Sequence, residues 1–173
     1  NNIDWSKQLE SAGCTVIYGF DDYKVHSKLT LITKKSKEGY SYITQIGTGN
    51  YNEKTSELYT DYSFITADHG IGEEASNVFQ NLAVQKLTEE SDRMLVAPLR
   101  FKSVLLEEMD RVIAAARMGR PASMILKNNS ISDRDIILKL QEASCAGVRI
   151  DMIVRGICCL RSGIEDLTDN ILI

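Results

Sequence analysis

The sequence predicts an α/β protein made of two parts, in which mixed or parallel sheets are flanked by helices. Three observations support this fold class. The chain has 173 residues, of which 43% are hydrophobic and 25% charged, enough for one domain or two small domains with true cores. Its first half carries short β-rich runs, and its second half alternates strand patterns with helical patterns. Such alternation is typical of a parallel sheet with right-handed crossovers.

The first half is expected to begin with a helix over residues 2–12, capped by Asn2 and ended by Gly13. Runs rich in β-branched and aromatic residues then predict four strands, at residues 14–19, 25–33, 40–46 and 58–66. A charged turn, residues 34–39, and a loop, residues 47–52, connect them, and a helix is expected over residues 71–84.

A polar, acidic stretch at residues 88–92 is the best candidate for a domain boundary, so we expect domains at 1–92 and 93–173. In the second domain, strands are expected at residues 94–97, 122–127 and 149–154, and a further strand is expected to start near residue 170. Helices are expected over residues 101–118 and from Ser132 to residue 146, the latter with Asp133 and Asp135 in its first turn.

Composition excludes several classes of protein. The net charge of −4 argues against a general polyanion binder, so a phosphate site would depend on locally placed lysines and arginines. No run approaches the roughly 18 apolar residues of a membrane span, and the polar start shows no signal peptide. The cysteines form no CxxC pair and lie in or beside apolar stretches, which favours buried, reduced thiols: Cys14, Cys145, Cys158 and Cys159.

His26 and Lys28 stand two residues apart in an expected strand, so their side chains should share a face roughly 7 Å apart. A neutral imidazole beside an ammonium group suits phosphoryl transfer, because the ring nitrogen can attack phosphorus while the cation offsets charge on the oxygens. On its own the pair is a weak signal, since a single strand histidine is more often structural.

The loop GTGNYN lies at a strand end, where its two glycines could let an anion approach the backbone and Thr48, Asn50 and Asn52 could donate hydrogen bonds. Taken alone, the loop favours a tight turn over an anion site. Tyr59 and Asp61 share a face of the next expected strand, and a carboxylate near His26 could hold the imidazole in one tautomer.

Polar residues also follow the strands expected in the second half. Arg155 comes directly after one strand, with Arg161 shortly beyond it, and Lys127, Asn129 and Ser130 end the preceding strand. The carboxyl ends of parallel strands are where α/β sheets bind ligands. Surface loops are polar in any case, so these clusters alone do not establish a site.

Together these segments resemble polyphosphate kinase of the long, histidine-phosphorylating type. The matching stretches keep the order of that family and cover nearly the whole chain: NNIDW, VHSKLTLI, IGTGNYNEKTSELYTDYSFITAD, MLVAPLRF, NSISDRDII and EASCAGVRIDMIVRGICCLR. The resemblance implies the later part of one phospholipase D-like domain and the early part of a second, together part of the catalytic half of a longer enzyme.

The resemblance also implies roles for individual residues. His26 matches the family's autophosphorylated histidine, Lys28 completes its HxK motif, and Asp61 matches the carboxylate that partners the histidine. Tyr59 and Arg155 match residues that contact ATP. The implied reaction is the reversible transfer of the terminal phosphate of ATP to inorganic polyphosphate through phosphohistidine, with Mg²⁺. The implied parent enzyme is a cytoplasmic homo-oligomer, able to associate peripherally with membrane, that acts on ATP, ADP and polyphosphate and not on nucleic acid.

Departures from the family pattern narrow these expectations. The resemblance places a second active-site histidine after residue 173 and phosphate-binding arginines before residue 1, so the isolated chain is expected to be inactive. Ser162 stands where the family usually has proline. Two alternatives stay open: a phospholipase D-like phosphodiesterase and a non-catalytic module that binds phosphate or nucleotide. Thr33 stands where the phosphodiesterase motif would place aspartate, which counts against the first alternative.

Overall fold

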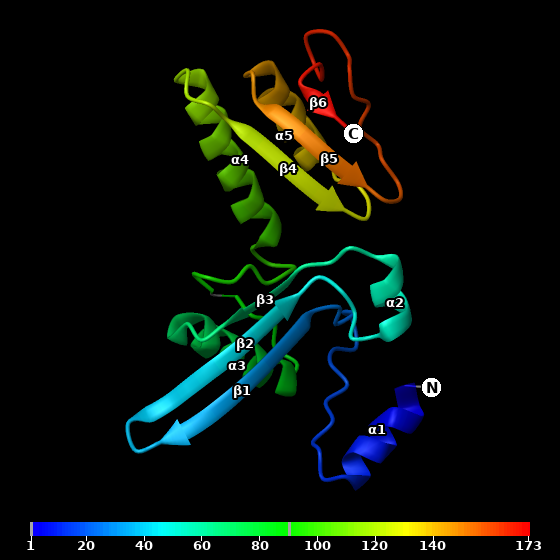
Figure 1. Ribbon diagram of the computed structural model, residues 1–173, viewed down its shortest axis with the longest axis vertical. Helices are drawn as coiled ribbons and strands as arrows, with labels where there is room; N and C mark the ends of the chain where they lie inside the picture. The colour runs from blue at the N-terminus through cyan, green and yellow to red at the C-terminus, as the bar shows by residue number, and fades with distance from the viewer. Residues whose placement is uncertain (1, 90) are drawn as a thin grey trace. The chain divides into compact units, whose positions relative to one another are not determined.

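The computed structural model describes residues 2–89 and 91–173, and the chain divides into two compact units, Asn1–Leu99 and Arg100–Ile173. Each unit combines helices with a three-stranded sheet, which confirms the predicted α/β class (Figure 1). A division at residue 92 stays a prediction, and the stretch expected to carry it includes Glu90, which lies outside the described residues.

Helix α1 (Asn2–Ser11) ends where the sequence predicts. Gly13 takes a left-handed conformation, with φ of +89°. Its N–H donates to the Glu10 carbonyl and the N–H of Cys14 donates to the Leu9 carbonyl, both at 3.0 Å. This pattern satisfies the last carbonyls of the helix. The side chain of Asn2, the expected cap, lies outside what the structure describes.

The sheet of the first unit is antiparallel and follows chain order: β1 (Lys28–Ser36), β2 (Gly39–Gly47) and β3 (Ser63–Thr66). The predicted hairpin of the first two strands is confirmed, although its turn is shorter than expected because Ser36 already pairs with Gly39. At the other end of the sheet Lys28 pairs with Gly47, which pairs in turn with Ser63. The segments that enter and leave the sheet there meet at one edge.

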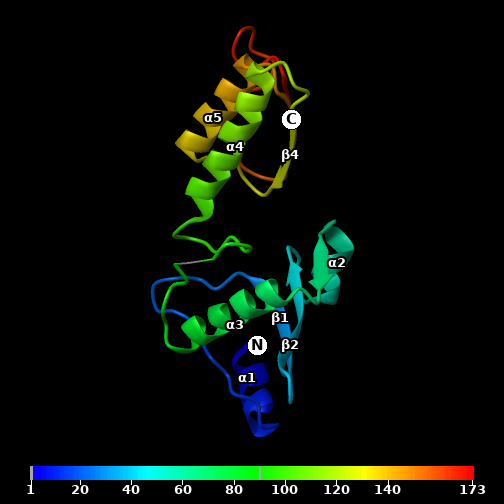
Figure 2. The ribbon, with the colours of Figure 1, turned by 90° about the vertical axis from the view of Figure 1, so that its left-hand side faces the viewer.

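Helix α3 (His69–Ala83) confirms the helix expected over residues 71–84 and covers one face of this sheet (Figure 2). The Asp68 carboxylate caps it by accepting the N–H of Ile71 at 2.9 Å. Ala75 and Val78 are buried. Gly72 packs directly on the Tyr42 side chain, where a Cβ atom would overlap, so the helix lies close against β2.

Three strand predictions in the first unit need correction. Residues 14–19 form no strand, β1 begins only at Lys28, and residues 58–66 are split between helix α2 (Glu53–Leu58), an irregular segment and β3. His26, Tyr59 and Asp61 therefore lie outside strands. β-branched and aromatic residues form a strand only where a neighbouring strand supplies hydrogen bonds, which composition does not reveal.

The second unit is a parallel sheet in the order β4-β5-β6, formed by β4 (Ser123–Asn128), β5 (Arg149–Val154) and β6 (Ile171–Leu172). Helices α4 (Phe101–Arg117) and α5 (Arg134–Cys145) lie on the same face of it (Figure 2). These elements confirm the expected strands and helices and the strand start near residue 170. The strand expected at residues 94–97 is wrong, because Met94 lies in a bend, residues 95–96 have no regular structure and Ala97 lies in a turn.

The core of the second unit lies between the two helices and the sheet, and includes Met109, Ile113, Leu140, Ala143, Val148, Ile150 and Met152. Asp133 caps α5 by accepting the N–H groups of Asp135 and Ile136 at 3.0 and 3.1 Å. The four cysteines are exposed, so the expectation that they are buried is wrong. Among the described helices, none is long and apolar enough to cross a membrane.

Candidate active site

His26 and Lys28 lie together at the edge of the first sheet where β1 begins. The Lys28 ammonium nitrogen Nζ is 3.0 Å from His26 Nδ1 and 3.1 Å from Nε2, and it donates to the His26 carbonyl at 2.6 Å. His26 is exposed, whereas Lys28 is 8% exposed. The two groups are closer than the roughly 7 Å expected for strand neighbours, because His26 precedes the strand and the lysine side chain turns back toward it.

This contact defines what the pair can do chemically. An ammonium group only donates hydrogen bonds, so a ring nitrogen that pairs with Lys28 must be unprotonated. The lone pair of that nitrogen becomes a nucleophile for phosphorus only when the ammonium group turns from the ring to a phosphoryl oxygen. The adjacent cation would stabilise the negative charge that gathers on a transferring phosphoryl group.

The loop after β2 is held by its own protein contacts. The Thr48 hydroxyl donates to the Asp61 carboxylate at 2.8 Å and accepts the N–H of Tyr62 at 2.9 Å. The Asn52 side chain accepts the N–H of Thr55 at 3.1 Å and so caps α2. Two of the three side chains expected to bind an anion thus have internal partners, and the loop orders neighbouring residues instead.

Tyr51 of the same loop makes contacts that the sequence analysis did not predict. Its hydroxyl lies 2.9 Å from the Thr30 hydroxyl and donates to Gln45, whose amide donates to Ser63 at 2.9 Å. Thr30 pairs with Gln45 across β1 and β2. The network therefore crosses all three strands. A correct register would have placed Thr30 beside Gln45, but no local signal marks Tyr51.

Tyr59 and Asp61 come from the irregular segment before β3. The Tyr59 N–H donates to the Thr55 carbonyl at 3.2 Å and ends α2. Asp61 is exposed. Within the part of the chain that the structure describes, the Asp61 carboxylate binds Thr48 and is not hydrogen bonded to His26. The structure therefore places Tyr59 and Asp61 in the segment that leads from α2 into β3, and no hydrogen bond in the described residues joins Asp61 to His26.

Arg155 belongs to the second unit and directly follows β5, as the sequence predicts. It is exposed, and its N–H donates to the Asn128 carbonyl at 3.2 Å. The next residue, Gly156, donates to the Asn129 carbonyl at 2.6 Å, and a Cβ atom there would lie 2.9 Å from that oxygen. Lys127 and Arg155 thus stand at the carboxyl ends of adjacent parallel strands.

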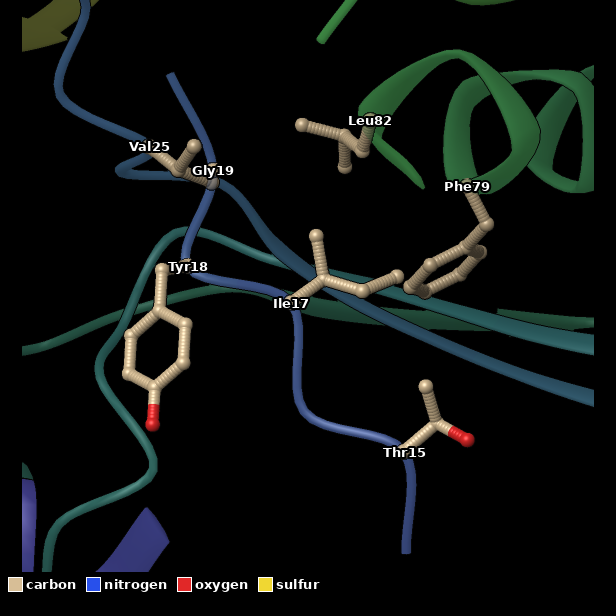
Figure 3. Close-up of a pocket in the computed structure, with 7 residues that line it drawn as sticks. All are labelled: Thr15, Ile17, Tyr18, Gly19, Val25, Phe79 and Leu82. Carbon is tan, nitrogen blue, oxygen red and sulfur yellow. The ribbon is translucent and has the colours of Figure 1, made fainter. Parts of the chain in front are cut away.

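A separate cavity of about 300 Å³ lies in the first unit between the extended segment before His26 and α3 (Figure 3). In that view the Ile17 side chain lies beside Phe79. The lining carries no charged side chain and consists of Thr15, Ile17, Tyr18, Gly19, Val25, Phe79 and Leu82. Such a cavity suits an apolar occupant and not a polyphosphate.

A resident metal ion would need several protein ligands gathered in one place. Within residues 2–89 and 91–173, no group of three His, Cys, Asp or Glu side chains could hold one. The described residues therefore offer no Mg²⁺ site built from protein ligands alone. In proteins Mg²⁺ is commonly held by one or two carboxylates together with substrate phosphates.

Comparison with protein families gives one consistent result. A family described as "Polyphosphate kinase C-terminal domain 1" matches residues 1–88, and "Polyphosphate kinase C-terminal domain 2" matches residues 94–173. The two matches together cover nearly the whole chain, in the order in which the domains are numbered.

Individual relatives agree with the family match. Proteins named polyphosphate kinase from Staphylococcus saprophyticus and Lactiplantibacillus plantarum are 43% and 44% identical over 171 residues, which is 99% of this chain and 24% of each relative. A crystal structure of polyphosphate kinase from Porphyromonas gingivalis matches with a TM-score of 0.85 and 33% identity, over 99% of this chain and 29% of that one. The chain spans about a quarter of the length of these curated relatives.

Proposed function

The chain belongs to the polyphosphate kinase family, and on that premise we propose that it takes part in reversible phosphoryl transfer between ATP and inorganic polyphosphate, with His26 as the phosphate carrier. The observation that most supports this proposal is the Lys28 ammonium group 3.0 Å from the exposed His26 ring. It supplies both a nucleophile and a cation at the place where the family motif HxK falls.

The proposed reaction has two steps with His26 free again at the end. An unprotonated His26 nitrogen attacks the terminal phosphorus of ATP; an N–P bond forms, the bond from that phosphorus to the bridging oxygen breaks, and ADP leaves. A terminal oxygen of polyphosphate then attacks the phosphohistidine, so that an O–P bond forms and the N–P bond breaks. The chain has grown by one phosphate, and the same steps run in reverse.

Other residues are proposed to support these steps. Lys28 offsets charge on the phosphoryl oxygens. Asp61 is proposed to orient the imidazole and to stabilise its charged form. Tyr59 and Arg155 are proposed to contact ATP, the arginine through paired hydrogen bonds to phosphate. The parent enzyme is proposed to be a cytoplasmic homo-oligomer, peripherally associated with membrane, that uses ATP together with Mg²⁺ and does not bind nucleic acid. No step is assigned to Mg²⁺ on these residues.

Labelling with γ-labelled ATP tests the proposal. A polypeptide of the relatives' full length that carries these 173 residues should acquire acid-labile, alkali-stable label, as expected for phosphohistidine. The variant His26→Ala should acquire none, while His69→Ala, the matched control at the sequence's other histidine, should label like the parent. Label that persists at the same level in His26→Ala would exclude His26 as the carrier.

A further inference from the structure

The register of the first sheet continues past its last paired row. Lys28, Gly47 and Ser63 form that row across β1, β2 and β3. Counted two residues further along each chain segment, this register would set Gly49 opposite both His26 and Asp61, which all lie outside the strands themselves. The N–H of Thr48 donates to the Tyr62 carbonyl at 3.0 Å, so the pairing of the second and third segments does continue beyond the ladder.

On this count Gly49 falls on the middle segment, between the segments that carry the histidine and the aspartate. Neighbouring strands lie about 4.8 Å apart, so the two outer positions are separated by roughly 10 Å. A side chain at the centre would fill that space. The Asp61 carboxylate already covers the glycine, because a Cβ atom at Gly49 would lie only 2.6 Å from Asp61 Oδ2 and 2.8 Å from Asp61 Cγ.

Gly49 is not among the glycines with positive φ, so other residues could adopt its backbone conformation. Glycine is needed here because the Asp61 side chain leaves no room for a Cβ atom. Thr48 then fixes the carboxylate over it. The threonine hydroxyl donates to Asp61 Oδ1 at 2.8 Å while it accepts the N–H of Tyr62 at 2.9 Å, so its own orientation is set by the backbone. Oδ1 is engaged in this way, and Oδ2 is the oxygen above the glycine.

We propose that Thr48 and Gly49 are positioning residues, which hold the Asp61 carboxylate across an open central position where it can reach the His26 imidazole. In this proposal the GTGNYN loop positions the Asp61 carboxylate beside the phosphate carrier and does not itself bind an anion. This inference rests on the proposed function, since it assumes that Asp61 acts on His26.

The experiment uses the full-length polypeptide and compares Thr48→Val, Thr48→Ser, Gly49→Ala and Asp61→Asn. Rates of His26 phosphorylation are measured as a function of ATP concentration. Thr48→Val and Gly49→Ala should lower kcat about tenfold or more, because a misplacement of about 1 Å can cost about 100-fold, while KM for ATP stays within about twofold. Thr48→Ser keeps the hydroxyl and should restore most of the rate.

A matched control and a double variant separate positioning from folding. Thr33→Val removes an exposed hydroxyl for which the structure records no hydrogen bond in the described residues, and should react like the parent. Thr48→Val should add little to Asp61→Asn, since two changes that act through one carboxylate are not additive. If Gly49→Ala does not fold, the comparison of Thr48→Val with Thr48→Ser still tests the proposal.

Each contrary outcome has a distinct meaning. Parent-like kcat in Thr48→Val while Asp61→Asn is impaired would overturn the positioning role and leave the proposed function standing. Thr48→Ser as slow as Thr48→Val would show that the hydroxyl is not the working group and would overturn it as well. Parent-like labelling by Asp61→Asn would remove Asp61 from the proposed function, and this inference with it.

Discussion

At the scale of single residues, Lys28 combines features that rarely occur together. It is only 8% exposed, and its ammonium group donates hydrogen bonds to the ring and the carbonyl of His26. Holding a cation away from water is unfavourable unless it is paired. A lysine kept there against this cost points to a role in charge stabilisation beside the proposed nucleophile.

Lys28→Met tests that role, because methionine has a similar length and tolerates burial. We expect the rate of phosphohistidine formation to fall about 100-fold or more, the loss seen when one transition-state donor is removed, with little change in the urea midpoint of unfolding. Lys34→Met is the matched control. Lys34 lies on the same face of β1, and it is exposed, so its loss should not affect the site. Equal labelling rates in the two variants would contradict a catalytic role for Lys28.

The site was only partly predictable from its residues. The HxK spacing predicts that the side chains of His26 and Lys28 lie near each other, and the structure brings them within 3.1 Å. The loop was expected to offer Thr48 and Asn52 to an anion, whereas both bind other parts of the protein. Those partners depend on which residues face each other across the sheet, which a local pattern does not reveal.

At the scale of elements, helix α3 anchors the segment that follows the first unit's sheet. The Glu74 carboxylate accepts the Ser91 hydroxyl and the N–H groups of Asp92, Arg93 and Met94. Arg93 in turn binds the Asp68 carboxylate at 3.0 Å. Burial raises the pKa of Glu74, but the hydrogen bonds from Ser91 and the three backbone N–H groups outweigh it and lower the pKa below its ordinary value of 4.5.

This anchoring predicts a specific pH dependence. Because the folded-state pKa of Glu74 is lowered, its contribution to stability is complete above the ordinary value of 4.5 and is lost as pH falls through the folded pKa. At pH 7, Glu74→Gln should reduce the free energy of unfolding by about 2 kcal/mol, the scale of hydrogen bonds to a charged group. Urea unfolding across pH 3–7, roughly the range in which carboxylates titrate, should show the difference shrink toward acid.

Glu73→Gln supplies the control for that measurement. Glu73 is the adjacent residue of α3, exposed, with a 3.4 Å contact to His69. A surface change of this kind should alter stability by no more than about 0.5 kcal/mol. A pH-independent loss in Glu74→Gln, or an equal loss in Glu73→Gln, would show that the hydrogen-bonded carboxylate is not the stabilising group.

Elements with a pattern of their own were predicted well, and those that depend on partners were not. Helices α3, α4 and α5 have apolar faces and clear starts or stops, such as Asp133 before α5 and Gly147 after it. The strands expected at residues 14–19 and 94–97 have suitable composition but form no ladder. Helix α2 was missed because it has only six residues and its signal is a single capping residue, Asn52.

At the scale of the whole molecule, the chain divides into two units and spans about a quarter of its curated relatives, and its main buried hydrophobic cluster lies in the second unit. The proposed groups are divided between the units: His26, Lys28, Tyr59 and Asp61 lie in the first, and Arg155 in the second. Fold and family could be predicted from ordered motifs. The rest of the proposed reaction would depend on the remaining three quarters of the relatives' length.

The isolated 173-residue chain is therefore predicted to fold without making polyphosphate. The resemblance implies that a second histidine and phosphate-binding arginines of the proposed site lie outside these residues. Loss of even one transition-state donor costs about 2.7–4 kcal/mol, or roughly 100- to 1,000-fold in rate. Circular dichroism should show mixed helix and strand, while incubation of the purified chain with γ-labelled ATP and a polyphosphate primer should yield no longer chains. A full-length relative, assayed alongside, should elongate the primer. Measurable elongation by the isolated chain would mean that its own residues form a sufficient active site.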